Sequence, residues 1–162
     1  MLSFLSWMDL LLIFLFISVG FLLSREKNGK NIIILYLIGL FFSEVINFLL
    51  KEWIKEPRPH SNSGYKDYGM PSNHAQTAFY IIGYYLLTII YNFYNYKIET
   101  IIEKINKNLI LFSLIVIAFA VSCGRLYYRY HTLNQIIIGS IIGLMLGFIF
   151  AFISFFVFPK ND

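Results

Sequence analysis

The stretch that decides the fold reads Arg125-Leu-Tyr-Tyr-Arg-Tyr-His131-Thr-Leu-Asn-Gln135 and lies between two long apolar segments, 109–123 and 136–158. It contains an arginine six residues before a histidine and a glutamine four residues after that histidine. One interpretation is a polar connector between two membrane helices. The other is a reaction centre, because phosphoryl transfer through a phosphohistidine requires a histidine with an orienting neighbour and a nearby arginine. The rest of the chain bears on this choice.

The composition is that of a membrane protein. Of the 162 residues, 58% are hydrophobic and 14% are charged, and a soluble domain of this length does not need so much apolar surface. The formal net charge of +4 is spread over short polar segments, which argues against nucleic acid as a partner. A single cysteine, Cys123, excludes a disulfide within the chain. The length predicts one domain, residues 1–162.

The apolar segments predict an all-α fold, a polytopic transmembrane helical bundle of about five spans. The expected spans are 2–23, 31–50, 74–94, 109–124 and 132–158. Between them we expect a mixed-charge connector at 97–108 and a polar loop at 51–73, and loops that long in compact proteins are often functional. Three glycines spaced by four predict that the last span packs closely inside the monomer rather than at a dimer seam: Gly139, Gly143 and Gly147.

Two apolar segments carry a carboxylate. Asp9 lies in the first segment, which lacks a basic n-region and therefore favours an anchor over a cleavable signal peptide. Glu44 interrupts the second segment and should face the bundle interior. Seven-residue spacing would place Glu44, Lys51 and Arg58 on one helix face if the helix continued to the nearby prolines. We expect Glu44 to be a structural partner of Lys51 or of a backbone group; catalysis is the alternative.

Three polar clusters fall on the same predicted side of the membrane as the N-terminus. The clusters are Lys51 with Arg58-Pro59, then Pro71-Ser72-Asn73-His74, then Arg125 with His131 and Gln135. All three histidines of the chain also lie on this side: His60, His74 and His131. Their order and shared side indicate one candidate site.

The distribution of cations predicts the orientation. The side opposite the clusters carries seven: Arg25, Lys27, Lys30, Lys97, Lys104, Lys107 and Lys160. The cluster side carries six: Lys51, Lys55, Arg58, Lys66, Arg125 and Arg129. If Lys51, Arg58 and Arg125 bind a substrate anion, three cations remain there against seven. The positive-inside rule then places the clusters outside the cytosol.

The three clusters resemble the motifs of the type 2 phosphatidate phosphatase superfamily, also called the acid phosphatase/haloperoxidase fold. Its pattern is Lys-x6-Arg-Pro, then Pro-Ser-Gly-His, then Ser-Arg-x5-His-x3-Asp. The first motif is intact here, the second has Asn73 for the glycine, and the third has Gly124 for the serine and Gln135 for the aspartate. The resemblance covers about 44–147. Tyr-His-Thr-x-x-Gln and Gly-Met-Pro-Ser-x-His-x-Gln are similar to the dolichyl-diphosphatase branch.

The resemblance implies roles for three catalytic residues. His131 would attack the terminal phosphorus and form a phosphohistidine. Gln135 would accept the other ring N–H, as the aspartate does elsewhere, but without its charge. This loss should weaken stabilisation of the histidine cation. His74 would protonate the leaving oxygen and then activate water.

The resemblance also implies a phosphate-binding set and no cofactor. Lys51, Arg58 and Arg125 would neutralise the phosphate oxygens. Ser72 and the backbone N–H of Asn73 would bind the anion at a helix start. No carboxylate cluster with metal-ligand spacing is present in the sequence, so no metal is expected.

The implied activity is hydrolysis of a polyisoprenyl (dolichyl) diphosphate to the monophosphate and inorganic phosphate, which recycles the glycan carrier lipid for N-glycosylation. The expected location is the endoplasmic reticulum membrane, crossed several times, with the site facing the lumen. The partners would be the lipid substrate and the bilayer. One alternative is a phosphatase of phosphatidate or undecaprenyl diphosphate. The other is an inactive lipid-binding member, which Gln135 supports and the intact His131 and His74 oppose.

Overall fold

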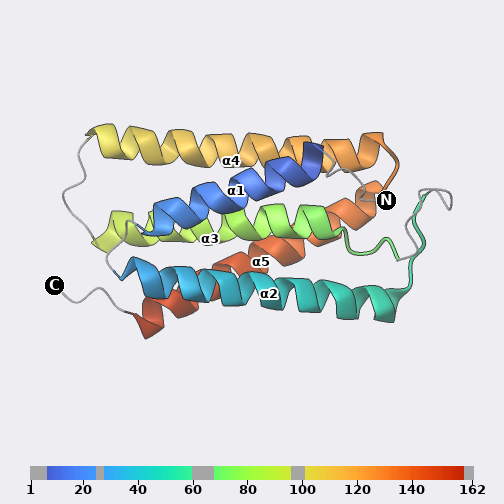
Figure 1. The fold of residues 1–162 in the computed structure, drawn as a ribbon, viewed down its shortest axis with the longest axis horizontal. Helices are drawn as coiled ribbons and strands as arrows, with labels where there is room; N and C mark the ends of the chain where they lie inside the picture. Colours follow the sequence, from blue (N-terminus) through green and yellow to red (C-terminus); the bar gives the residue numbers. More distant parts are fainter. Residues whose placement is uncertain (1–6, 25–27, 60–67, 96–100, 159–162) are drawn as a thin grey trace.

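The computed structural model describes residues 7–24, 28–59, 68–95 and 101–158. Every regular element in these ranges is a helix, and the helices run lengthwise through one bundle (Figure 1). They are α1 (Trp7–Ser24), α2 (Gly29–Ile54), α3 (Asn73–Asn95), α4 (Ile101–Tyr127) and α5 (Leu133–Val157). The predicted all-α bundle is confirmed.

Helix α3 is the centre of the bundle because it contacts all four other helices. Three helical stretches are long and apolar enough to cross a membrane: Gly29–Ile54, Ile105–Tyr127 and Leu133–Val157. The apolar stretch of α1 is shorter. Helix α3 carries asparagine, glutamine, threonine and tyrosine, which a helix surrounded by protein tolerates better than one surrounded by lipid. The chain is a multi-pass integral membrane protein.

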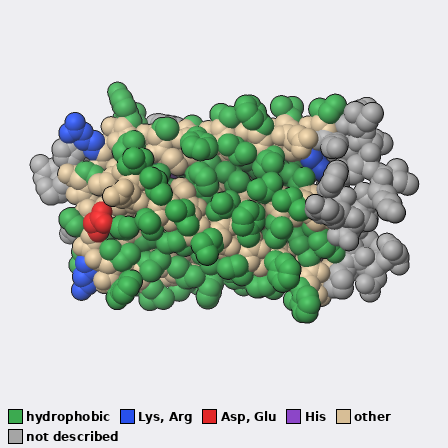
Figure 2. Space-filling view, turned by 180° about the vertical axis from the view of Figure 1, so that it is seen from behind, with side chains coloured by type: hydrophobic (Ala, Val, Ile, Leu, Met, Phe, Trp, Pro, Cys, Tyr) green, Lys and Arg blue, Asp and Glu red, His purple; other side chains and the backbone are tan. Residues whose placement is uncertain are grey.

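The outer surface is apolar over most of its length. Figure 2 shows hydrophobic side chains across the visible face, with charged groups near the two ends of the bundle. Among the large exposed apolar side chains on four helices are Phe14, Phe41, Phe112 and Phe152, each at least 60% exposed. Such a surface would be a liability in water and suits the hydrocarbon of a bilayer.

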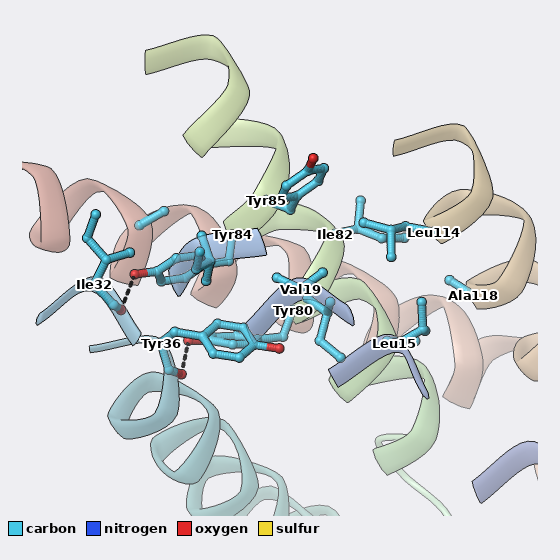
Figure 3. Close-up of a cluster of buried hydrophobic side chains, with 14 of the residues drawn as sticks. Leu15, Val19, Ile32, Tyr36, Tyr80, Ile82, Tyr84, Tyr85, Leu114 and Ala118 are labelled. Atoms are coloured by element: carbon cyan, nitrogen blue, oxygen red, sulfur yellow. Dashed lines mark hydrogen bonds between the residues drawn. The ribbon is translucent and has the colours of Figure 1, made fainter. Parts of the chain in front are cut away.

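Buried tyrosines join α2 to α3. The Tyr80 hydroxyl donates a hydrogen bond to the carbonyl of Tyr36 over 2.9 Å, and the Tyr84 hydroxyl donates to the carbonyl of Ile32 over 3.0 Å (Figure 3). The rings of Tyr36 and Tyr84 meet edge to face at 5.1 Å. Tyr80 and Tyr84 thereby bury their rings and satisfy their hydroxyls.

Glycines bring α5 against the backbone of α3. A Cβ at Gly143 would collide with the carbonyl oxygen of Gln76, and one at Gly147 with that of Tyr80. A Cβ at Gly139 would lie 2.5 Å from the carbonyl oxygen of Ser72. The predicted close packing inside the monomer is confirmed, and it places the beginning of α3 beside the first turns of α5.

Two helix boundaries differ from the sequence prediction by four residues or more. Helix α2 continues past Leu50 to Ile54 and ends at Lys55, whose φ of 54° is left-handed. Helix α4 already begins at Ile101, so the predicted connector is wrong for 101–108. Charged residues such as lysine and glutamate are good helix formers. Leaving the apolar segment is therefore not the same as leaving the helix.

The contact between α3 and α5 predicts a large difference between two glycine substitutions. Gly143→Ala should destabilise the protein by about 1–3 kcal/mol, because the methyl group meets backbone that cannot rotate away. Gly20→Ala in α1 is the matched control, since nothing lies within 4 Å of its Cβ. Thermal unfolding in detergent measures both, with roughly 2–4 °C expected per kcal/mol in a chain of this size. Equal melting temperatures for the two variants would contradict the packing.

Candidate active site

The three polar clusters meet at one end of the bundle, where α2 and α4 end and α3 and α5 begin (Figure 1). Lys51 and Arg125 stand in the last turns of α2 and α4. The carbonyl of Arg125 accepts hydrogen bonds from the backbone N–H groups of Tyr130 and His131, over 3.0 and 3.3 Å. The connector thus folds back and carries His131 toward the end of α4.

His131 is 1% exposed and has partners at both ring nitrogens. Its Nδ1 lies 2.8 Å from the carbonyl oxygen of Gly69 and 3.1 Å from Oε1 of Gln135. A carbonyl oxygen only accepts, so Nδ1 carries the proton. Its Nε2 lies 2.9 Å from a guanidinium nitrogen of Arg58 and accepts from it. His131 is therefore a neutral imidazole with its lone pair on Nε2.

The electrostatic surroundings keep His131 neutral. Burial, followed by the guanidinium groups of Arg58 and Arg125, lowers the pKa of His131 from 6.5 to about 3. The hydrogen bond to Gln135 acts in the opposite direction but is weaker, and the Lys51 ammonium lowers the pKa further. The lone pair on Nε2 is consequently present throughout the physiological pH range.

Gln135 lies where the sequence places it, and it also belongs to the cap of α5. Thr132 is the N-cap and accepts from the backbone N–H of Gln135, while Oε1 of Gln135 accepts from the N–H of Thr132. This reciprocal capping box fixes the side chain. A Cβ at Gly69 would lie 2.6 Å from the amide atoms of Gln135. Only glycine at this position lets the 68–70 segment reach the histidine.

Three cations act on His131, and one of them, Arg58, lies at its Nε2. Arg58 also donates to the carbonyl of Tyr130 over 3.1 Å, and the Lys51 ammonium donates to the carbonyl of Tyr68 over 2.9 Å. Arg125 is 2% exposed, and its guanidinium carbon lies 4.6 Å from the centre of the Tyr130 ring. Arg58 follows the end of α2, so it does not extend the helix face of Lys51. A turn at Lys55 brings it to the histidine instead.

The beginning of α3 presents the second cluster. Ser72 is fully buried, and its hydroxyl has no hydrogen-bond partner among the described residues. The side chains of Asn73 and Thr77 donate to the carboxylate of Glu44, over 2.8 and 2.7 Å. Glu44 has a structural role, as expected, but the prediction that it pairs with Lys51 or a backbone group is wrong. Its carboxylate instead holds two side chains in the first turn of α3.

His74 pairs with a residue that sequence reasoning left without a role. Its Nε2 lies 2.6 Å from a carboxylate oxygen of Asp9, on α1. The carboxylate accepts this bond, so Nε2 carries a proton and Nδ1 is the other proton-exchanging atom. A carboxylate in an apolar segment was the available signal, because such groups are costly unless they have a partner.

Among the described residues, no group of three or more histidine, cysteine, aspartate or glutamate side chains lies close enough together to hold a metal ion. The chemistry that this geometry supports is nucleophilic attack by Nε2 of His131 on an anionic centre.

A family model, that of the PAP2 superfamily, matches residues 32–158. The chain belongs to the PAP2 superfamily. Among curated proteins it resembles Dolichyldiphosphatase 1 of Homo sapiens, at 33% identity over 132 residues, which cover 79% of this chain and 55% of that protein. Dolichyldiphosphatase 1 of Dictyostelium discoideum is 34% identical over 141 residues, covering 86% and 58%. The chain spans little more than half the length of these relatives.

A solved structure shares the fold of this PAP2 superfamily chain. It is the transmembrane PAP2 type phosphatidylglycerolphosphate phosphatase from Bacillus subtilis, with a TM-score of 0.68 and 21% sequence identity. The match covers 93% of this chain and 72% of that one. All of α1, including Asp9, lies before the range that the family model matches. Asp9, the partner of His74, therefore comes from a helix outside the matched region.

The geometry predicts the titration of His131 in this PAP2 superfamily chain. In ¹⁵N spectra of histidine-labelled protein in detergent, His131 should remain the neutral Nδ1–H tautomer from about pH 8 down to about pH 5, well below the range of an ordinary histidine. Arg58→Gln removes one cause of the lowered pKa and should move the pKa upward. His131→Gln assigns the signal. Wild-type titration near the ordinary value of 6.5 would contradict this arrangement.

Proposed function

We propose that this chain is a lipid phosphohydrolase that removes the terminal phosphate from a polyisoprenyl diphosphate of the dolichyl class. The observation that carries the proposal is the buried lone pair of His131 Nε2, which accepts from Arg58, on a ring that also lies in the field of Arg125 and Lys51. A neutral nucleophile among positive charges suits attack on a phosphorus with anionic oxygens.

The first step forms a phosphohistidine. A phosphate oxygen takes over the hydrogen bond that Arg58 makes to Nε2, and this frees the lone pair. The bond from Nε2 to phosphorus forms while the bond from phosphorus to the bridging oxygen breaks. His74 gives a proton to that oxygen, and the lipid monophosphate leaves. Asp9 holds the ring of His74 during this transfer.

The second step releases the phosphate. A water molecule loses a proton to His74 as its oxygen bonds to phosphorus. The bond from phosphorus to Nε2 breaks, inorganic phosphate leaves, and His131 becomes neutral again. In-line displacement in both steps requires that His74 and His131 act from opposite sides of the same phosphorus.

The phosphate oxygens would bind at the beginning of α3 as well as to the cations. The fully buried hydroxyl of Ser72 has no partner among the described residues, and an anion would satisfy it. The first N–H groups of a helix have no partner inside that helix, which favours anions there. The side chain of Asn73 is held by Glu44. Asparagine in place of the family's glycine therefore leaves the backbone N–H to the substrate.

The names of the similar proteins favour a polyisoprenyl diphosphate over another lipid phosphate, and an apolar groove beside the site favours a lipid substrate. The similar proteins from Homo sapiens and Dictyostelium discoideum are named as dolichyldiphosphatases. An apolar groove of about 330 Å³ also lies beside the site, between α4 and α5, and would hold the first isoprene units. Its lining includes Phe79, Ser122, Leu126, Leu133, Ile136 and Ile137. The location that fits this substrate is the endoplasmic reticulum membrane, with the site facing the lumen.

Phosphate release from purified protein tests the substrate class. Dolichyl diphosphate should be hydrolysed much faster than dolichyl phosphate, phosphatidate or undecaprenyl diphosphate. His131→Ala should lower kcat by roughly 10³-fold or more, as loss of a covalent nucleophile does. The exposed neighbour Asn134→Ala is the control and should retain wild-type activity. Equal rates on phosphatidate would refute the substrate class, and an active His131→Ala variant would refute the nucleophile.

Labelling of engineered cysteines tests the orientation. In a Cys123→Ala background, Asn134→Cys marks the site end and Asn106→Cys marks the opposite half of α4, and both positions are exposed. In sealed microsomes, a membrane-impermeant maleimide should label Asn106→Cys directly. It should label Asn134→Cys only after permeabilisation, because the positive-inside rule puts the site end in the lumen. The reverse pattern would place the site in the cytosol.

A further inference from the structure

Glu56 lies directly behind Gln135, on the side away from His131. One oxygen of its carboxylate accepts a hydrogen bond from Nε2 of Gln135 over 2.7 Å. The carbonyl of Pro57 accepts a second bond from the same Nε2 over 3.0 Å. Gln135 is fully buried and Glu56 is partly buried. The carboxylate is thus one amide group away from the imidazole.

The partners of Gln135 allow only one orientation of its amide. The carboxylate of Glu56 and the carbonyl of Pro57 are acceptors, so they must face the NH₂ group. The backbone N–H of Thr132 is a donor, so it must face Oε1. Oε1 then also faces Nδ1–H of His131. The donor and acceptor inventory therefore defines a chain that runs from the imidazole through the amide to the carboxylate.

The backbone holds Glu56 in this position. Its carbonyl accepts a hydrogen bond from the N–H of Gly69 over 2.8 Å, and the carbonyl of Gly69 in turn accepts from Nδ1 of His131. A hydrogen bond thus joins Glu56 to Gly69, and both residues lie on the Nδ1 side of His131. The cations Arg58, Arg125 and Lys51 all oppose a positive charge on this ring.

We propose that Glu56 is the positioning residue that supplies, through the Gln135 amide, the negative charge missing next to His131. This rests on the proposed function, in which His131 becomes positively charged as it bonds to phosphorus. A carboxylate that accepts from Nε2 of Gln135 polarises the amide and makes its Oε1 a stronger acceptor, since linked hydrogen bonds reinforce each other. No proton crosses the amide. The combination of Gln135 and Glu56 does what an aspartate does by direct contact.

An exchange of charge between positions 56 and 135 tests this role. Glu56→Gln keeps an oxygen that can accept from Gln135 and removes only the charge. It should lower kcat by roughly 10- to 100-fold, the range found for outer partners of metal-bound histidines, with KM nearly unchanged. Gln135→Glu in that background returns the carboxylate, now in contact with His131, and should recover much of the loss. Recovery is partial because a carboxylate oxygen then faces the carbonyl of Pro57.

The controls separate a charge effect from a structural one. Glu52→Gln removes the same charge from an exposed position on α2 and should leave kcat unchanged. An unchanged kcat in Glu56→Gln would show that Glu56 accepts a hydrogen bond from Gln135 but that its charge does not contribute to catalysis, and this would overturn the proposal. A double variant no better than Glu56→Gln would overturn it as well. Melting temperatures show whether each variant is folded.

A spectroscopic measurement keeps this proposal distinct from the proposed function. The ¹⁵N shift of Nδ1 in His131 should change in Glu56→Gln and stay unchanged in Glu52→Gln, whether or not the protein hydrolyses a lipid. If the wild type releases no phosphate from any lipid, the proposed function fails and this shift still tests the coupling. An Nδ1 shift that is identical in all three proteins would overturn the role of Glu56.

Discussion

The site depends on the hydrogen bonds that the side-chain amide of Gln135 makes. Its oxygen accepts from His131 and from the backbone of Thr132, and its nitrogen donates to Glu56 and to the carbonyl of Pro57. These four bonds join the start of α5, the connector before it and the segment after α2. The acceptors on one side and the donor on the other allow only one orientation of the amide. This one buried group therefore helps to fix the tautomer and ring orientation of His131 and the position of the segment after α2.

Charge is distributed unevenly around the histidine. Arg58 lies against Nε2, and Arg125 and Lys51 also act on the ring from the same buried region. Glu56 lies beyond Nδ1, behind the amide. A buried cluster of cations is costly unless an anion compensates it. The arrangement therefore favours a phosphate group at Nε2 and offers a counter-charge on the side where the imidazole needs it when it becomes positive.

Helix α3 connects this chemistry to the membrane fold. The glycines of α5 pack against its backbone and place Ser72 beside the first turns of α5. Glu44 of α2 accepts hydrogen bonds from Asn73 and Thr77. Helix α1 contributes Asp9 to His74. The two histidines thus lie at separate helix starts, each connected to a carboxylate from another part of the chain, directly for His74 and through an amide for His131.

The helices, their approximate bounds, the shared side of the three clusters and the contact between His131 and Gln135 could all be predicted from the sequence. All of these follow from hydropathy or from spacings of a few residues, which a helix or its cap converts directly into geometry. The partners of Asp9, Glu44 and Glu56 could not be predicted and emerge only in the folded chain, because they lie 65, 29 and 79 residues away. Such pairs depend on how helices cross and loops fold back, and no local periodicity encodes that.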